Sequence, residues 1–84
     1  MTNKEILIKK ILYRSTHRGT KEMDMLLGNF VKFYINTLND IELNDLQNLI
    51  LLEDEVIYKW YSGNSVKNLV PINKVTDLLR KFKI

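Results

Sequence analysis

Residues 18–24, Arg-Gly-Thr-Lys-Glu-Met-Asp, hold the densest group of side chains in this chain that could take part in chemistry. The segment combines one glycine, two cations and two carboxylates, and apolar-rich segments flank it on both sides. If it forms the turn between two helices, it presents these charges in a fixed geometry. The residues alone leave two interpretations open. In the first, the basic side chains neutralise Glu22 and Gly19 only ends the preceding helix. In the second, the charged corner contacts a partner.

The same region does not contain a recognisable catalytic group. Glu22 and Asp24 are two positions apart, so on a helix they face different directions and do not form a ready acid–base pair. His17 is the only histidine, and the chain has no cysteine, which leaves a zinc site without its usual ligands. The chain also lacks a glycine-rich phosphate loop. We therefore expect neither catalytic residues nor a metal site.

The charges fall into three blocks of alternating sign. Residues 1–21 have a balance of +5, residues 22–58 a balance of −7 and residues 59–84 a balance of +5, which gives the net charge of +3. A small basic helical chain could bind nucleic acid, because neutralised phosphates supply much of the affinity for a duplex. The acidic middle block would repel a duplex, so we expect no nucleic-acid partner. A nucleic-acid-binding module stays an alternative, as does a generic helical interaction domain.

Apolar side chains recur at helical spacing through most of the chain, and strand signals are weak. This pattern predicts an all-α fold, a small compact five-helix bundle with no sheet, in which short connections make neighbouring helices antiparallel. The second helix has the strongest period and is expected to be the central core element. We expect residues 1–84 to form a single domain. The expected helices cover about residues 3–14, 20–38, 39–52, 53–61 and 71–82.

Local signals predict where these helices begin. Thr2 fits a capping box with the glutamate three residues later, and Thr20 is expected to cap the second helix. Asn39 is expected to cap the third helix. Pro71 is expected to be the first residue of the fifth helix, where its missing N–H costs nothing. Gly19, which separates the first two helices, is expected to take a left-handed conformation that costs other residues about 1 kcal/mol or more.

Two features depend on how the helices pack. Gly28 interrupts the second helix, and either the close approach of a neighbouring helix or simple tolerance of a glycine accounts for it. The second feature is an aromatic group near the end of the fourth helix. We expect Trp60 and Ile57 to point inward, and Tyr58 or Tyr61 to lie near the rim, where a partner could contact it.

Nothing in the sequence indicates secretion or membrane insertion. No apolar run approaches the ~20 residues that span a bilayer. The first five residues lack the pattern of a signal peptide. The absence of cysteine suits a reducing compartment. We expect a cytoplasmic protein that does not insert into a membrane.

The segment 18–24 resembles the Arg-Gly-x-x-Glu-x-Asp signature of the succinate dehydrogenase flavinylation factor family, which comprises FAD assembly factors. The upstream Tyr13-Arg14-Ser15 resembles the Tyr-x-Ser that precedes the family signature. The segments Leu51–Asp54 and Ile57–Trp60 also resemble family segments. The resemblance covers about residues 5–82. The chain departs from the family at His17, where many bacterial members have arginine, and in the connection from residue 63 to residue 71.

The resemblance implies an assembly chaperone, not an enzyme. It implies a chain that binds the flavoprotein subunit of succinate dehydrogenase, or the related fumarate reductase flavoprotein, and promotes covalent attachment of FAD to a histidine of that subunit. FAD would belong to the partner, and this chain, expected to be a monomer, would bind no cofactor stably. The residues carried over as partner-binding are Arg18, Gly19 and Glu22, with Asp24 supporting the turn. The expected partner-binding surface also includes His17 and Tyr58.

Overall fold

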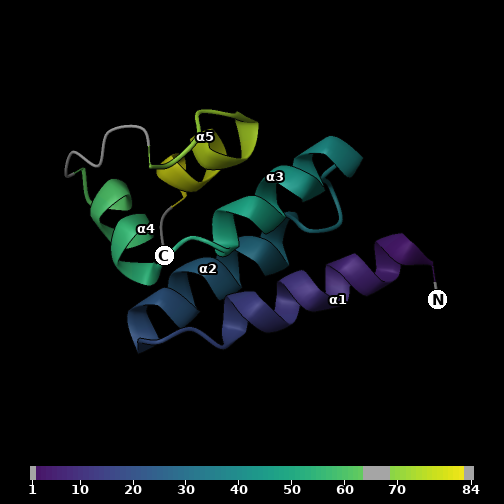
Figure 1. Cartoon of the computed structure of the whole chain (residues 1–84), viewed down its shortest axis with the longest axis horizontal. Helices are drawn as coiled ribbons and strands as arrows, with labels where there is room; N and C mark the ends of the chain where they lie inside the picture. Colours follow the sequence, from purple (N-terminus) through teal and green to yellow (C-terminus); the bar gives the residue numbers. More distant parts are fainter. Residues whose placement is uncertain (1, 64–68, 83–84) are drawn as a thin grey trace.

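The computed structural model describes residues 2–63 and 69–82, and it confirms the all-α prediction for them. Helix α1 spans Asn3–Thr16, α2 spans Lys21–Tyr34, α3 spans Asp40–Ile50, α4 spans Asp54–Tyr61 and α5 spans Lys74–Lys81. The described residues contain no strand. The fold measures 39 × 25 × 20 Å along its principal axes. Helices α1 and α2 run antiparallel, α3 packs on α1, α5 packs on α3, and α4 closes the end where α2 begins (Figure 1).

The core confirms α2 as the central element. Among the described helices α2 buries the most residues, and Leu27, Phe30 and Val31 are completely inaccessible to solvent. Two aromatic side chains of α1 and α2 lie largely outside the core. Tyr13 is 64% exposed and Phe33 is 69% exposed. Helical spacing identifies the face of a helix, but it does not show how far the neighbouring helices cover that face.

Three predicted N-caps are present in the structure. The Oγ1 atom of Thr2 accepts a hydrogen bond from the Glu5 N–H, and Thr20 Oγ1 accepts one from the Met23 N–H. Asn39 forms a complete capping box with the glutamate three residues later. These side chains satisfy N–H groups that have no partner inside the helix, so the local sequence is sufficient to set these starts.

The predicted start of the fifth helix was wrong. Helix α5 begins at Lys74, and Asn73 is its N-cap in a capping box with Thr76. Pro71 lies ahead of the helix, where its carbonyl oxygen accepts a hydrogen bond of 2.9 Å from Thr76 Oγ1. The Asn73 cap satisfies N–H groups of the first turn, whereas a proline at N1 only avoids an unpaired one. The first helix also extends two residues beyond its expected end, to Thr16.

Gly28 allows the end of α1 to approach α2 closely. A Cβ atom at this buried position would lie 3.3 Å from Thr16 Cγ2 and 3.6 Å from the Ser15 carbonyl oxygen. The first distance is shorter than an ordinary van der Waals contact. Of the two interpretations left open by the sequence, the structure therefore supports the close approach of a neighbouring helix.

Replacing Gly28 with leucine should lower the free energy of unfolding by about 2–3 kcal/mol, because the side chain has no room between α1 and α2. Urea unfolding monitored by circular dichroism measures this change. The control is Asn29→Leu, since Asn29 is the next residue on α2 and is exposed. Equal stability of the Gly28→Leu and Asn29→Leu variants would contradict the close packing of α1 on α2.

Glu42 joins the cap of α3 to α5. Its side chain is 11% exposed, accepts a hydrogen bond of 2.9 Å from the Asn39 N–H, and lies 3.1 Å from Lys74 Nζ. The Asn39 N–H, and after it the Lys74 ammonium group, lower the pKa of Glu42 below its ordinary value of 4.5. The ionised carboxylate therefore favours the folded state above the ordinary pKa. This contribution is lost as the pH falls through the lowered value.

Glu42→Gln should be less stable than the wild type at neutral pH, and the difference should shrink as the solution is acidified below pH ~4.5. Glutamine keeps the capping box but removes the charge. Urea unfolding across this pH range measures the difference, with Glu53→Gln as an exposed control. A difference that stays constant with pH would contradict the assignment to the Glu42 carboxylate.

None of the helices in the described ranges is long and apolar enough to cross a membrane.

Candidate functional site

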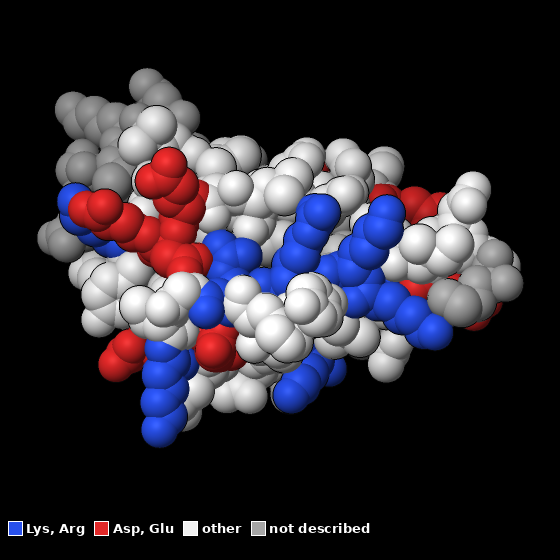
Figure 2. All heavy atoms as spheres, turned by 60° about the horizontal axis from the view of Figure 1, so that its bottom comes forward, with Lys and Arg blue, Asp and Glu red and all other residues white. Residues whose placement is uncertain are grey.

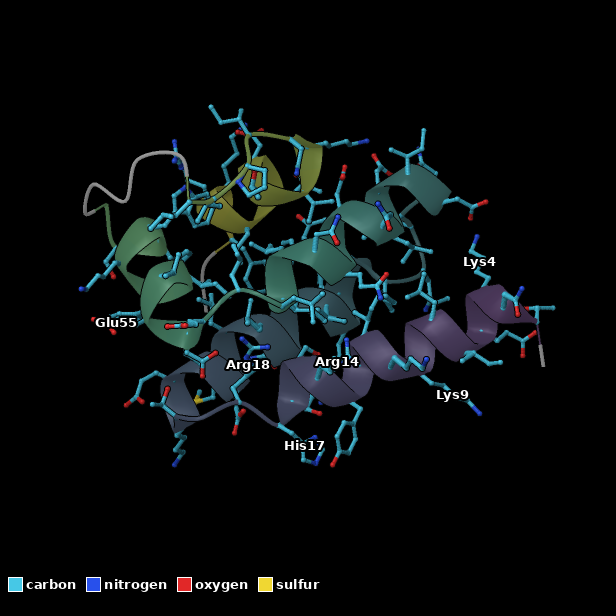
Figure 3. The ribbon with its side chains drawn as sticks, viewed as in Figure 1. Lys4, Lys9, Arg14, His17, Arg18 and Glu55 are labelled. Atoms are coloured by element: carbon cyan, nitrogen blue, oxygen red, sulfur yellow. The ribbon has the colours of Figure 1, made fainter. Side chains whose placement is uncertain are left out.

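The side chain of Arg18 turns inward from the α1–α2 corner. It is 10% exposed, and its guanidinium group lies between the end of α3 and the start of α4 (Figure 3). The Nη1 atom donates to the Ile50 carbonyl oxygen at 2.6 Å, and Nη2 donates to the Leu52 carbonyl oxygen at 3.1 Å. These oxygens belong to the end of α3 and the following turn, where carbonyl groups lack helical partners. Arg18 therefore acts as a C-terminal cap for α3.

Asp54 fastens the corner to α4. Its Oδ1 atom accepts a hydrogen bond of 2.7 Å from Arg18 Nε and lies 2.6 Å from Arg18 Nη2. Its Oδ2 atom accepts a hydrogen bond of 2.8 Å from the Gly19 N–H. Arg18 therefore pairs with Asp54, 36 residues away, and the ion pairs within the described residues include none between Arg18 or Lys21 and Glu22. The local pairing considered from the sequence is not the one that forms.

Gly19 is required for space and not for a left-handed backbone. Gly63 is the glycine with a positive φ, so the conformation expected at Gly19 was wrong. A Cβ atom at Gly19 would lie 3.2 Å from Asp54 Oδ2, which is closer than an ordinary contact. The same oxygen receives the Gly19 N–H, and this hydrogen bond draws the backbone against the aspartate. The absence of a side chain at Gly19 therefore allows the corner to approach α4 closely.

Asp24 holds the turn from the α2 side. Its Oδ1 atom accepts a hydrogen bond from the backbone N–H of Arg18. Asp24 lies in the first turn of α2, where the helix dipole also favours a carboxylate. This contact agrees with the supporting role that the family signature implied for Asp24.

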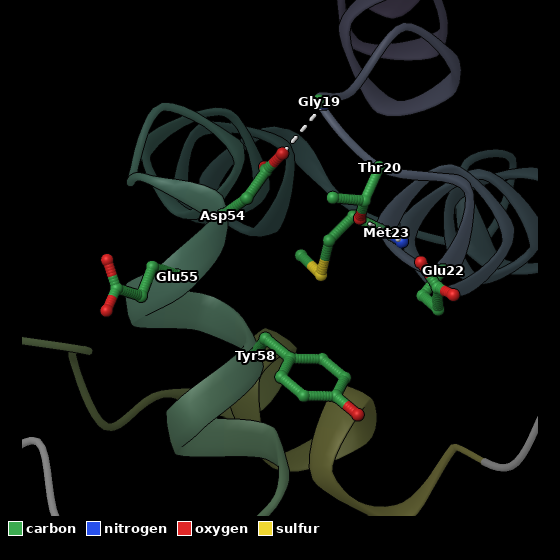
Figure 4. Close-up of a pocket in the computed structure, with 7 residues that line it drawn as sticks. All are labelled: Gly19, Thr20, Glu22, Met23, Asp54, Glu55 and Tyr58. Atoms are coloured by element: carbon green, nitrogen blue, oxygen red, sulfur yellow. Dashed lines mark hydrogen bonds between the residues drawn. The ribbon is translucent and has the colours of Figure 1, made fainter.

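A surface hollow of about 590 Å³ opens beside this corner, between the first turns of α2 and α4 (Figure 4). Two of its walls come from residues 19–23 and from residues 54–58, which are far apart in the sequence. Met23 and the ring of Tyr58 provide apolar surface, and Glu22 lies at the α2 side. The residues that line the hollow are Gly19, Thr20, Glu22, Met23, Asp54, Glu55 and Tyr58.

The structure divides the six residues predicted to bind a partner. Gly19, Glu22 and Tyr58 line the hollow together, and Tyr58 is half exposed, as expected for a residue near the rim. Arg18 and Asp24 lie behind them as internal ties of the turn. Their predicted contact with a partner remains a prediction, but the guanidinium group is already engaged by groups of its own chain.

His17 lies apart from the hollow. Its ring stacks on Tyr13, with the ring centroids 4.0 Å apart, and its Nδ1 atom lies 2.8 Å from the Tyr13 carbonyl oxygen. Figure 3 shows this side chain pointing away from Arg18, toward the outer face of α1. A partner that contacts both His17 and the hollow would have to extend around the corner.

Asp54 is the main residue of the site that the sequence did not single out. The segments Leu51–Asp54 and Ile57–Trp60 contributed to the family resemblance, and Asp54 is the last residue of the first segment. Its partners Arg18 and Gly19 are 36 and 35 residues away in the sequence. The sequence shows an arginine and a glycine in a turn and a carboxylate at the start of a later helix. It does not show which carboxylate contacts the turn.

The exposed charges separate only in part along the molecule, since the exposed Lys21 lies in the first turn of α2 at the acidic end. Figure 2 shows basic side chains along the face formed by α1, and acidic side chains gathered at the end that holds the first turns of α2 and α4. The exposed residues at the acidic end include Glu22, Glu53 and Glu55. Within residues 2–63 and 69–82, no three His, Cys, Asp or Glu side chains lie close enough to share a metal ion. The arrangement is suited to contact with another molecule at the hollow.

Within residues 2–63 and 69–82, the fold is a small five-helix bundle in which an internal arginine–aspartate pair fastens the first turn between helices. Comparison with known proteins specifies the family. Residues 9–83 match the family described as the flavinator of succinate dehydrogenase, and the chain belongs to this family. This finding confirms the resemblance drawn from residues 18–24 and from the two later segments.

Individual relatives agree with the family assignment. The chain is 33% identical over 74 residues to the FAD assembly factor SdhE of Acetobacter pasteurianus, a match that covers 88% of this chain and 65% of that protein. It is 36% identical over 58 residues to the mitochondrial succinate dehydrogenase assembly factor 2 of Arabidopsis thaliana, covering 69% of this chain and 31% of that protein. The protein of the same name from Dictyostelium discoideum is 41% identical over 56 residues, a match that covers 67% of this chain and 40% of that protein.

The matches cover less than two thirds of the length of each of these relatives. No solved structure gave a significant match.

Proposed function

We propose that this chain is an assembly factor that binds the flavoprotein subunit of succinate dehydrogenase and promotes the covalent attachment of FAD to it. The observation that carries this proposal is the family match over residues 9–83. The relatives named as FAD or succinate dehydrogenase assembly factors support it. The structure adds a defined hollow beside the signature turn, to which Gly19 and Glu22 contribute.

The proposed mechanism is differential binding. A partner that can adopt several conformations shifts toward the one that the chain binds most tightly. The corner is suited to this role because Arg18 and Asp54 hold it rigidly, so the chain loses little freedom when it binds. Stabilising the flavin-binding conformation of the flavoprotein would bring its own reacting groups together more often. The chemistry stays with the flavoprotein, and this chain acts as a helper without catalytic residues.

FAD belongs to the flavoprotein, and the chain itself binds no cofactor stably and acts as a monomer. We place it in the cytoplasm, which the bacterial relative supports, whereas other relatives are named as mitochondrial. The fumarate reductase flavoprotein is a second target of the same kind.

Deletion of the gene tests the proposed function. Covalent flavin on the dehydrogenase subunit is measured by fluorescence of the denatured protein in a gel. The deletion should remove most of this fluorescence while the subunit is still produced, and a plasmid copy should restore it. Unchanged covalent flavin in the deletion strain would contradict the proposal. If tagged chain recovered nucleic acid in place of the flavoprotein subunit, a nucleic-acid-binding module would be favoured. The basic face of α1 is the surface that would bind nucleic acid in that case.

A further inference from the structure

The hollow beside the corner combines an apolar wall with negatively charged side chains. Met23 is 2% exposed, and the half-exposed ring of Tyr58 extends from α4 toward the first turn of α2 (Figure 4). The Tyr58 ring therefore offers most of the accessible apolar surface, and Met23 adds only a small thioether area beside it. Such surface binds the aliphatic stem of a long side chain as well as a flat cationic group.

The carboxylates around the hollow are not equivalent. Both oxygens of Asp54 are engaged by Arg18 and the Gly19 N–H, so this charge is neutralised within the fold. Glu55 is exposed and forms a surface pair of 2.8 Å with Lys59. Glu22 has no ion-pair partner among the described residues, and no lysine or arginine lines the hollow. Glu22 is therefore the carboxylate available to a binding partner.

The two helix N-termini at the hollow would attract an anion if no side chain of this chain already occupied them. The starts of α2 and α4 both lie here, and a helix N-terminus attracts anions. Thr20 caps α2, however, and acidic side chains already occupy the first turn of each helix. An incoming anion would be repelled by the unpaired carboxylate of Glu22, whereas an incoming cation could pair with it.

We propose that the hollow accepts an arginine side chain from an exposed segment of the flavoprotein subunit, and this inference rests on the proposed function. The guanidinium group pairs with Glu22, and its face and aliphatic stem lie against the ring of Tyr58. Arginine fits better than lysine because its planar group stacks on an aromatic ring and binds a carboxylate through two hydrogen bonds. Glu22 and Tyr58 then determine which segment of the partner is recognised.

The test measures the affinity of the full chain for the purified apo-flavoprotein subunit by isothermal titration at low and at high salt. Glu22→Gln should weaken binding about tenfold or more at low salt and should reduce the salt dependence. Glu53→Gln is the matched control, because Glu53 is exposed at the start of α4 and does not line the hollow. It should change the affinity less than about threefold. Thermal unfolding verifies that both variants are folded.

Variants of Tyr58 test the aromatic wall separately. Tyr58→Phe should retain the affinity, whereas Tyr58→Ser should weaken it by about fivefold or more, because the ring is lost. Equal effects of Glu22→Gln and Glu53→Gln would overturn this inference, and so would tighter binding by Glu22→Gln, which would indicate an anion at the hollow. If the wild-type chain fails to bind the subunit, the proposed function is overturned and this inference with it. If it binds and Glu22→Gln binds equally well, this inference alone is overturned.

Discussion

Replacing Gly19 with arginine is expected to abolish the support of flavinylation while leaving a folded protein. The structural reason is local. A Cβ atom at position 19 would lie 3.2 Å from Asp54 Oδ2, and the remaining atoms of an arginine side chain would extend from a residue that lines the hollow. The new Cβ atom would require Asp54 to shift only by a few tenths of an ångström, and the rest of the side chain would occupy space that we assign to the partner. Because Gly19 is exposed, the core below it should remain packed.

Complementation of the deletion strain measures this effect as covalent flavin on the dehydrogenase subunit. Gly19→Arg should leave covalent flavin at the level of the deletion strain. Asn29→Arg is the control for the added charge, since Asn29 is exposed on α2 and does not line the hollow. It should restore covalent flavin as well as the wild type. If Gly19→Arg restored it equally well, the assignment of the corner as the partner-binding site would be wrong.

Replacing Asp54 with alanine is expected to lower the free energy of unfolding by about 2–4 kcal/mol. The substitution leaves the Arg18 side chain, 10% exposed, without its counter-charge, and it leaves the Gly19 N–H without an acceptor. Removing one partner from such a pair costs more than the pair contributes, because the other charge stays in a poorly solvated position. A domain of this length has a total stability of only about 4–13 kcal/mol, so the loss is a large part of it.

Urea unfolding at neutral pH measures the loss for Asp54→Ala. Glu55→Ala is the control, since it removes the neighbouring carboxylate, whose ion pair with Lys59 is on the surface. This control should change stability much less. A double-mutant cycle with Arg18→Ala isolates the coupling of the two side chains. A loss of less than about 0.5 kcal/mol for Asp54→Ala would show that the pair does not fasten the corner.

The helices and most of their starts could be predicted because they depend on residues close together in the chain. Thr2, Thr20 and Asn39 cap N–H groups three positions away, and a sequence shows such pairs directly. The start of α5 was missed for a related reason. Its capping box uses Thr76 at the position where a glutamate or glutamine is the usual signal, and the nearby Pro71 offered a competing start.

The internal use of Arg18 could not be predicted, because it depends on contacts across more than 30 residues. The sequence placed Arg18, Gly19 and Glu22 together on one turn, and the family signature treated them as one contact surface. In the structure Arg18 points into the protein, toward α3 and α4, whereas Gly19 and Glu22 line the hollow. A signature marks residues that a fold or function requires, but it does not separate those that hold the turn from those that meet a partner.

Because the Arg18 side chain points into the protein, a variant at position 18 tests stability as well as partner binding. Arg18→Ala should reduce both stability and function, since it removes the cap of α3 together with the tie to Asp54. Glu22→Gln should reduce function with little change in stability, because Glu22 is exposed. Comparing the two separates a residue that positions the site from a residue that contacts the partner.

The most direct test of the central claim is a reconstitution with purified components. Apo-flavoprotein subunit is incubated with FAD, with and without this chain, and covalent flavin is followed over time by fluorescence in a denaturing gel. The chain should increase the rate of covalent attachment, and the Gly19→Arg variant at the same concentration should not. The same rate with and without the wild-type chain would contradict its role as a factor that promotes flavinylation.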